Sequence, residues 1–288
     1  MTETPVDTLC DIPCELGEST LWDDVTGRLH WVDIDRALLF TLDWATRRVE
    51  TLRLPSTVGS VGLRSGGGLV AALRHALAFV ADDGTVEVVA EVESDVPGNR
   101  CNDGAVDPGG RFWFGTMDET ESAASGAFYC LRDDLSVTKA FGGVFVSNGP
   151  AWSPDGRTLY HVDSARSRIT AYEFDPATGA VGGGRLFASD EDEAWLPDGV
   201  TVDADGFVWN CKWDGGRIVR YSPDGRIDRV VELPVPRPTR CAFVGPELKL
   251  MAVTSARRGR GAAAPRSGQL LLLDPDATGL PAARFTGR

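Results

Sequence analysis

One pattern of turns and strands recurs along the chain and constrains the fold more than any other feature. A tight turn rich in Asp and Gly is followed by a strand with aromatic residues, a polar gap and a second strand. The copies lie at residues 22–33, 63–71, 106–115, 152–161, 202–209 and 243–251. Their turns return every roughly 40 to 50 residues, which is the period of a β-propeller blade. Because one small sheet cannot bury both faces alone, neighbouring units must stack.

Six such units in 288 residues predict an all-β fold, a single six-bladed β-propeller domain over residues 1–288 with a central channel. The strand chemistry agrees, since residues 168–174 alternate in polarity and then reach a turn cluster at 175–179. No segment shows the periodicity of a long amphipathic helix. An open ring would expose sheet edges, so the N-terminal strand, expected near residues 7–13, should pair into the last blade and close it.

Charge and composition exclude several classes of function. A formal net charge of -13 argues against nucleic-acid binding, which needs clustered Lys and Arg. No apolar run approaches the ~20 residues of a membrane span. The first seven residues are acidic and polar, without the features of a secretion signal, and we expect a cytoplasmic protein. The six cysteines form no CxxC pair, which favours reduced, buried thiols. No obligatory protein partner is evident.

Several polar residues occupy one recurrent place, just ahead of the first long strand of a unit and close to a glycine. Glu18 precedes the first unit, Asn102 and Asp103 the third, Asn148 the fourth and Asp198 the fifth. In a propeller the loops of all blades surround the mouth of one channel, so residues distant in sequence converge there. Taken singly, each of these residues is more often a turn former. Their recurrence is what points to a site.

The residue types at these positions suggest a metal ion. We predict that Glu18, Asn148 and Asp198 converge on one divalent cation, because two carboxylates and an amide oxygen suit a hard ion such as Ca²⁺, Mg²⁺ or Mn²⁺. Three protein ligands leave positions for water and substrate, as in catalytic sites. The three histidines are scattered, which disfavours a His-rich zinc site, and no GxSxG elbow is present.

Six short motifs occur in an order that resembles a known family. They are Gly17-Glu18-Ser19, Asn99-Arg100-Cys101-Asn102-Asp103-Gly104, Phe114-Gly115-Thr116-Met117, Ser147-Asn148-Gly149, Pro197-Asp198-Gly199 and Thr254-Ser255-Ala256-Arg257. Together they resemble the SMP-30/gluconolactonase/LRE-like family, which includes regucalcin and bacterial sugar lactonases. The likeness runs from about residue 10 to the end of the chain. It implies a six-bladed propeller with one divalent metal ion in its channel.

The resemblance also implies roles for particular residues. Glu18, Asn148 and Asp198 match the metal ligands of the family, and Asp198 also matches its general base. Arg100 and Asn102 match its substrate-binding positions, although Arg100 taken alone is equally a surface ion-pair partner.

A further substrate contact in this family is a glutamate shortly after the Gly-Thr-Met segment. Here the expected position is Thr120, with Glu119 and Glu121 on either side, and Glu119 is the preferred candidate. Trp195 and Trp213 are the tryptophans expected near a ligand, whereas the others are expected in the core.

These features predict a metal-dependent sugar lactonase that opens an aldonolactone, of the gluconolactone, xylonolactone or arabinonolactone type, to the aldonic acid. The metal would polarise the carbonyl and Asp198 would activate water. The ion is left open among Ca²⁺, Zn²⁺, Mn²⁺, Mg²⁺ and Fe²⁺. One alternative is another metal-dependent hydrolase on this scaffold, acting on phosphotriesters or non-sugar lactones. The other is a non-enzymatic calcium-binding or protein-interaction propeller, although Trp-Asp pairs occur only at 22–23 and 213–214.

Overall fold

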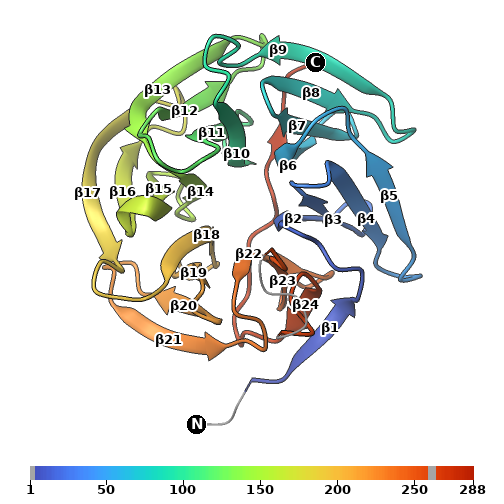
Figure 1. Cartoon of the computed structure of the whole chain (residues 1–288), viewed down its shortest axis with the longest axis vertical. Coiled ribbons are helices and arrows are strands. Elements are labelled where there is room, and N and C mark those ends of the chain that lie inside the picture. The colour runs from blue at the N-terminus through green and yellow to red at the C-terminus, as the bar shows by residue number, and fades with distance from the viewer. Residues whose placement is uncertain (1–3, 259–263) are drawn as a thin grey trace.

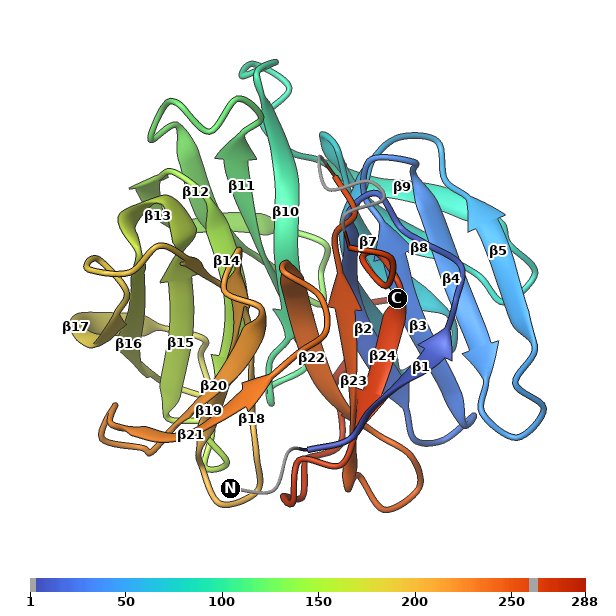
Figure 2. The same ribbon diagram turned by 60° about the horizontal axis from the view of Figure 1, so that its bottom comes forward.

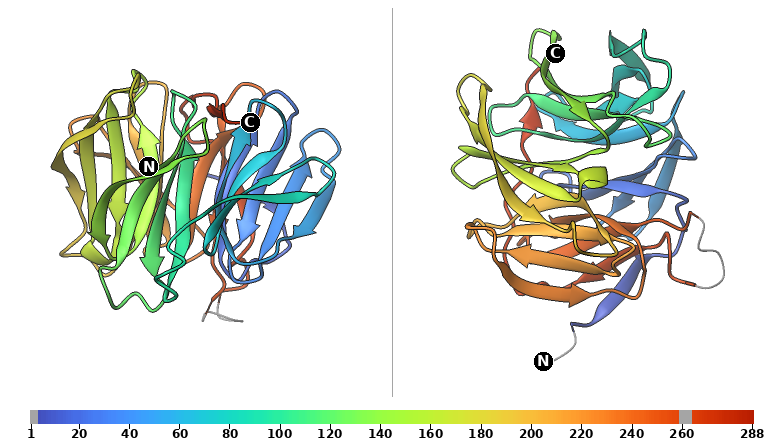
Figure 3. Two further views of the ribbon diagram at one scale, coloured as in Figure 1. Left: turned by 90° about the horizontal axis from the view of Figure 1, so that it is seen from above. Right: turned by 60° about the vertical axis from the view of Figure 1, so that its left-hand side comes forward.

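The computed structural model of the chain describes residues 4–258 and 264–288. The described residues form six sheets arranged in a ring (Figure 1), which confirms the predicted all-β, six-bladed propeller. Seen from the side, the blades stand next to one another around the ring axis (Figure 3). The predicted domain also includes residues 1–3 and 259–263, which lie outside the described part of the chain.

Each blade is an antiparallel meander, and its first strand in sequence lies nearest the ring axis. Blades one to three contain β2 (Gly17–Asp23), β3 (Arg28–Asp33), β4 (Leu38–Asp43) and β5 (Val49–Arg53); β6 (Val58–Arg64), β7 (Leu69–Leu73), β8 (Ala76–Val80) and β9 (Val86–Glu91); and β10 (Asn99–Val106), β11 (Phe112–Asp118), β12 (Gly126–Leu131) and β13 (Val137–Val144). Blades four to six contain β14 (Ser147–Trp152), β15 (Thr158–Asp163), β16 (Arg168–Phe174) and β17 (Val181–Ser189); β18 (Leu196–Val202), β19 (Val208–Trp213), β20 (Arg217–Tyr221) and β21 (Ile227–Glu232); and β22 (Pro238–Val244), β23 (Leu250–Ser255), β24 (Leu270–Leu273) and β1 (Val6–Cys10). Among the described residues, one short 3-10 helix, η1 (Ser164–Arg166), follows β15.

The recurrent turn of the sequence joins the inner strand of a blade to its second strand. In blade three the carboxylate of Asp107 accepts hydrogen bonds from Arg111 Nε at 2.6 Å and from Trp113 Nε1 at 2.8 Å. In blade five Asp203 accepts a bond from Trp209 Nε1 at 2.9 Å in the same way. Both carboxylates and both indoles are buried. The turn Asp and the aromatic strand after it are therefore one packing unit, which explains why they recur together.

The two ends of the chain complete two different blades. Strand β1 pairs antiparallel with β24 and forms the outer strand of blade six (Figure 2). It is shorter than the expected segment at residues 7–13, since Pro13 has no N–H to offer a ladder. Strand β25 (Arg284–Phe285) pairs parallel with β6, an addition that the sequence analysis did not predict. The segment before β25, drawn in red, crosses the ring from blade five, where Gly279 pairs with Asp203, to blade two (Figure 1).

The hydrophobic core lies between blades as well as within them. One buried cluster, for example, joins Trp209 and Ile218 of blade five to Phe243 and Met251 of blade six. All six cysteines are buried and unpaired, as expected. Within the described residues, no helix has the length and apolar character needed to cross a membrane.

Candidate metal and substrate site

A β-bulge interrupts the pairing of each inner strand at the same height in the ring. The register shifts lie between Glu18 and Leu21, Val58 and Ser60, Cys101 and Gly104, Asn148 and Ala151, Pro197 and Val200, and Pro238 and Cys241. A bulge bends its strand and changes the direction of the side chains beside it. Two glycines make the geometry possible: Gly149 has φ 60°, and a Cβ on Gly199 would lie 2.8 Å from the Thr239 carbonyl of the next blade.

One cavity, here called the site cavity, collects most of the predicted residues. Its lining includes Glu18, Arg100, Asn102, Asn148 and Asp198, which come from blades one, three, four and five. The propeller therefore brings together five of the six residues predicted from the sequence. The metal-binding, substrate-binding and catalytic roles assigned to them stay predictions.

A chain of hydrogen bonds fixes the orientation of Asn148. Arg100 Nη1 donates to Asn102 Oδ1 at 2.6 Å, and Asn102 Nδ2 donates to Asn148 Oδ1 at 2.9 Å. Asn148 Nδ2 donates in turn to Ser164 Oγ at 2.8 Å. Because a carbonyl oxygen has two lone pairs, Asn148 Oδ1 keeps one for a further ligand. Ser164, in helix η1, supports the amide, and no sequence signal had pointed to it.

Glu18 and Asp198 are buried carboxylates with little compensating charge. Burial raises the pKa of Glu18, and the negative charge of Asp103 raises it further. Burial likewise raises the pKa of Asp198, with the charge of Glu18 as the next cause. Neither carboxylate forms an ion pair with another described residue, and Glu18 Oε2 accepts only the N–H of Ser19, at 3.1 Å. Each carboxylate therefore favours its neutral form unless a cation lies beside it.

The donor atoms at this place suit a hard divalent cation. Two carboxylates and one amide oxygen are the ligand types that Ca²⁺, Mg²⁺ and Mn²⁺ prefer. Over residues 4–258 and 264–288, no three His, Cys, Asp or Glu side chains form a cluster that could hold a metal ion. The candidate set reaches three ligands only through the amide of Asn148, so it depends on the oriented Oδ1 described above.

The structure places Glu121, and not Glu119, on the site cavity. Glu119 faces away, and its carboxylate binds Arg74 through two hydrogen bonds of 2.8 and 2.7 Å. Between them the chain reverses around Asp118, whose Oδ2 accepts bonds from Thr120 Oγ1 and from the Ser122 N–H. The position of Glu119 thus differs from its sequence assignment, because this turn, with Glu121 at φ 59°, directs the two glutamates to opposite sides.

Two tryptophans had been expected near a ligand. Trp213 lines the site cavity. Trp195 does not, and the guanidinium of Arg217 lies 4.6 Å from its ring centroid.

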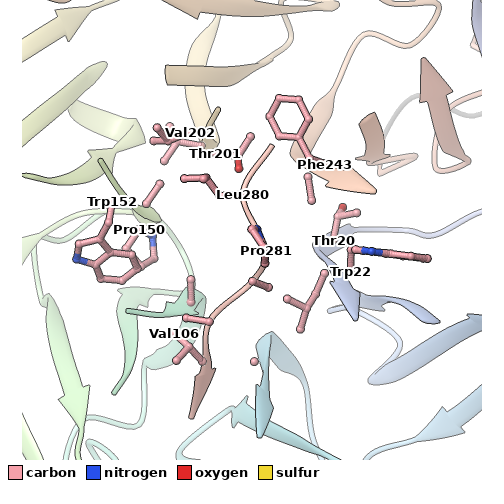
Figure 4. Close-up of a pocket in the computed structure, with 18 of the residues that line it drawn as sticks. Thr20, Trp22, Val106, Pro150, Trp152, Thr201, Val202, Phe243, Leu280 and Pro281 are labelled. Carbon is pink, nitrogen blue, oxygen red and sulfur yellow. The ribbon is translucent and has the colours of Figure 1, made fainter. Parts of the chain in front are cut away.

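A second cavity of about 450 Å³, here called the strap cavity, lies toward the other ends of the inner strands. Its lining includes Trp22, Trp152 and Phe243, and Leu280 and Pro281 of the C-terminal segment lie in its middle (Figure 4). The C-terminal segment therefore occupies this end of the channel, whereas the predicted site residues lie at the opposite end.

A buried imidazole supports the strand that carries Asn148. His161 Nε2 and Ser147 Oγ lie 2.8 Å apart, and the rings of Phe128 and Phe141 contact the imidazole edge to face. Burial lowers the pKa of His161 to about 3. The imidazole is therefore neutral in the folded protein at all but strongly acidic pH.

This lowered pKa predicts a particular pH dependence of stability. In the unfolded chain the pKa of His161 returns to about 6.5, so below that pH the unfolded state binds a proton that the folded state does not. The contribution of His161 is fully present above about pH 6.5 and is lost at roughly 1.4 kcal/mol per pH unit as the pH falls toward its folded pKa. Urea unfolding between about pH 6.5 and about pH 4.5 should show a steeper loss for the natural protein than for His161→Gln. Equal slopes in the two proteins would contradict the assignment.

Comparison with known proteins places this geometry in a family. A model of the family described as SMP-30/Gluconolactonase/LRE-like region matches residues 16–257. Regucalcin from Xenopus laevis is 37% identical over 252 residues, which is 85% of this chain and 84% of the relative. A solved structure from Agrobacterium tumefaciens, described as the calcium-binding protein regucalcin, is 30% identical and covers 99% of both chains with a TM-score of 0.94. A gluconolactonase from Xanthomonas campestris shares the fold, with 23% identity, coverage of 94% of this chain and 89% of the other, and a TM-score of 0.78.

Proposed function

Because the chain belongs to the SMP-30/gluconolactonase/LRE-like family, we propose that it is a divalent-metal-dependent lactonase that hydrolyses a sugar lactone to the aldonic acid. One observation carries the proposal: two buried carboxylates, an oriented amide oxygen and an arginine meet in a single cavity at one end of the channel. The family supports a lactonase-type activity, and the contents of the cavity support a polar substrate.

Glu18, Asn148 and Asp198 would hold the cation, and when bound it would polarise the ring carbonyl and lower the pKa of a water molecule. Asp198 would accept the proton of the attacking water. The water oxygen forms a bond to the carbonyl carbon, the ring C–O bond breaks, and the released oxygen takes up the proton. The carboxylate product then leaves the cavity.

The remaining polar residues would bind and orient the sugar. Arg100 makes its recorded hydrogen bonds through Nη1 to neutral oxygens, those of Cys101 and Asn102, so its other N–H groups can donate to the substrate. Such charge-assisted bonds also stabilise negative charge that develops on the reacting carbonyl. Glu121 replaces Glu119 as the proposed acceptor for sugar hydroxyls, since it lines the same cavity.

A calcium-binding propeller without enzymatic activity is the second candidate. It is favoured by the description of the Agrobacterium relative as a calcium-binding protein. The presence of Arg100 and Asn102 beside the proposed ligands favours the enzyme, because a protein that only binds an ion has no use for donors aimed at a substrate.

The test is acid release from a panel of five- and six-carbon aldonolactones, with metal-stripped protein and with each divalent ion restored. Spontaneous ring opening is subtracted with a protein-free control. We expect turnover to vanish on stripping and to return with one or a few ions, with a clear preference among the sugars. Ion binding without turnover of any lactone would reject the lactonase and leave the binding propeller or a different hydrolase.

A further inference from the structure

Three buried carboxylates and one guanidinium lie together behind the site cavity, and they are called here the charge cluster. Its members are Glu18, Asp103, Asp198 and Arg240, which are 6%, 2%, 5% and 8% exposed. They come from blades one, three, five and six, and each lies at the bulge of its inner strand. The charge of Asp103 raises the pKa of both Glu18 and Asp198, and that of Arg240 lowers both, so all four groups lie within electrostatic reach of one another.

Asp103 is fully engaged by partners within the protein. Arg240 Nη1 donates to Asp103 Oδ2, which also accepts the N–H of Gly149 at 3.0 Å. Its other oxygen accepts the N–H of Gly104 at 2.7 Å. Gly149 follows Asn148 directly, so Asp103 holds the backbone beside the amide that is proposed to bind the metal. Asp103 lines neither cavity, and it therefore acts on the site only through its neighbours.

The pair also sets how much negative charge is buried at the site. Arg240 balances Asp103, and the two carboxylates of Glu18 and Asp198 remain, which matches one divalent cation. Arg100 also lowers the pKa of Glu18, but its effect is the weakest of the electrostatic ones on that group. Unbalanced buried charge is costly, so changing either member of the pair changes the charge of the ion that the site prefers.

We propose that Asp103 and Arg240 form a positioning pair that fixes the Asn148 bulge and, by their mutual neutralisation, makes the site select a divalent ion. This inference rests on the proposed metal site and not on the identity of the lactone. Arg240→Met would leave an additional buried negative charge, whereas Asp103→Asn would leave an additional positive one. The two substitutions should therefore shift ion selectivity in opposite directions.

The experiment is calorimetric titration of metal-stripped full-length protein with Ca²⁺ and with Tb³⁺, ions of similar chemistry that differ in charge. Arg240→Met should raise the ratio of Tb³⁺ to Ca²⁺ affinity roughly tenfold, and Asp103→Asn should lower it by a similar factor. The double variant should return the ratio toward that of the natural protein, and Arg240→Lys should keep it.

A purely structural pair would give a different result, because loosening the site weakens both ions alike and leaves the ratio unchanged. That outcome would overturn the inference while the lactonase proposal stands. If Arg240→Met does not fold, the comparison of Asp103→Asn with Arg240→Lys still decides, since only the first changes the buried charge. Failure of the natural protein to bind either ion would overturn the metal site itself, and this inference with it.

Discussion

Asp198→Asn should lower kcat/KM for the preferred lactone by roughly 10³-fold at saturating metal, the usual contribution of a general base. Asn keeps the shape of the side chain and an oxygen for the cation, but it cannot accept a proton from water. Rates are measured by acid release, and the affinity of each protein for the restored ion is measured separately, so that lost metal binding is not mistaken for lost proton transfer.

The matched control is Asp205→Asn, a change of an exposed aspartate in the same blade, which should leave turnover as it is. If Asp198→Asn retained full metal-dependent turnover, Asp198 would not be the base, and another group on the site cavity would have to accept the proton.

Asp190→Ala should lower the free energy of unfolding by about 3–5 kcal/mol, the cost of leaving a buried charge without its partner. Lys212 has a fully buried side chain, and its Nζ donates to Asp190 Oδ2 at 2.5 Å and to the hydroxyl of Tyr221 at 2.8 Å. Asp190 follows blade four, and Lys212 lies opposite Pro197 on blade five, one residue before Asp198. The ion pair thus joins two blades beside the strand that carries the proposed base.

The pH dependence of this variant follows from the same pair. Burial lowers the pKa of Lys212 in the natural protein, and loss of Asp190 should lower it further. The unfolded lysine keeps its proton up to about pH 10.4, so the unfolded state binds more protons and stability should rise with pH across that window. Chemical denaturation of Asp190→Ala and of the double variant Asp190→Ala/Lys212→Met decides the cause. Recovery of most of the loss in the double variant is expected, and no recovery would show that the ion pair is not the reason.

The fold could be predicted to blade level because its signals are local. The Asp of each turn, the glycine that follows and the aromatic strand after them lie within about ten residues, and turn chemistry at that range is legible in a sequence. The recurrence of Asp107 with Trp113 and of Asp203 with Trp209 is such a signal, and the structure gives its reason in two indole hydrogen bonds. The parallel strand β25 carries no comparable signal, since two residues that pair with a strand more than 200 positions away leave no periodicity.

The candidate site was predictable only as a set of positions. Glu18, Asn148 and Asp198 stood out because each precedes a blade beside a glycine, and Arg100 and Asn102 because they belong to a motif. The partner of Asp103 could not be found in this way, because Arg240 lies 137 positions away and has no glycine beside it. The choice between Glu119 and Glu121 depended on a turn around Asp118 that directs them to opposite sides.

The sequence by itself therefore determined the number of blades, the end of each strand at which the polar residues lie and the chemical type of the proposed ligands. Only the tertiary structure decided which glutamate reaches the site cavity, which charges lie behind it and how the C-terminal segment occupies the opposite end of the channel. The physical reason is distance along the chain. Turns and strand periodicity form between near neighbours, whereas burial, charge balance and convergence arise only when the ring closes and places residues of different blades side by side.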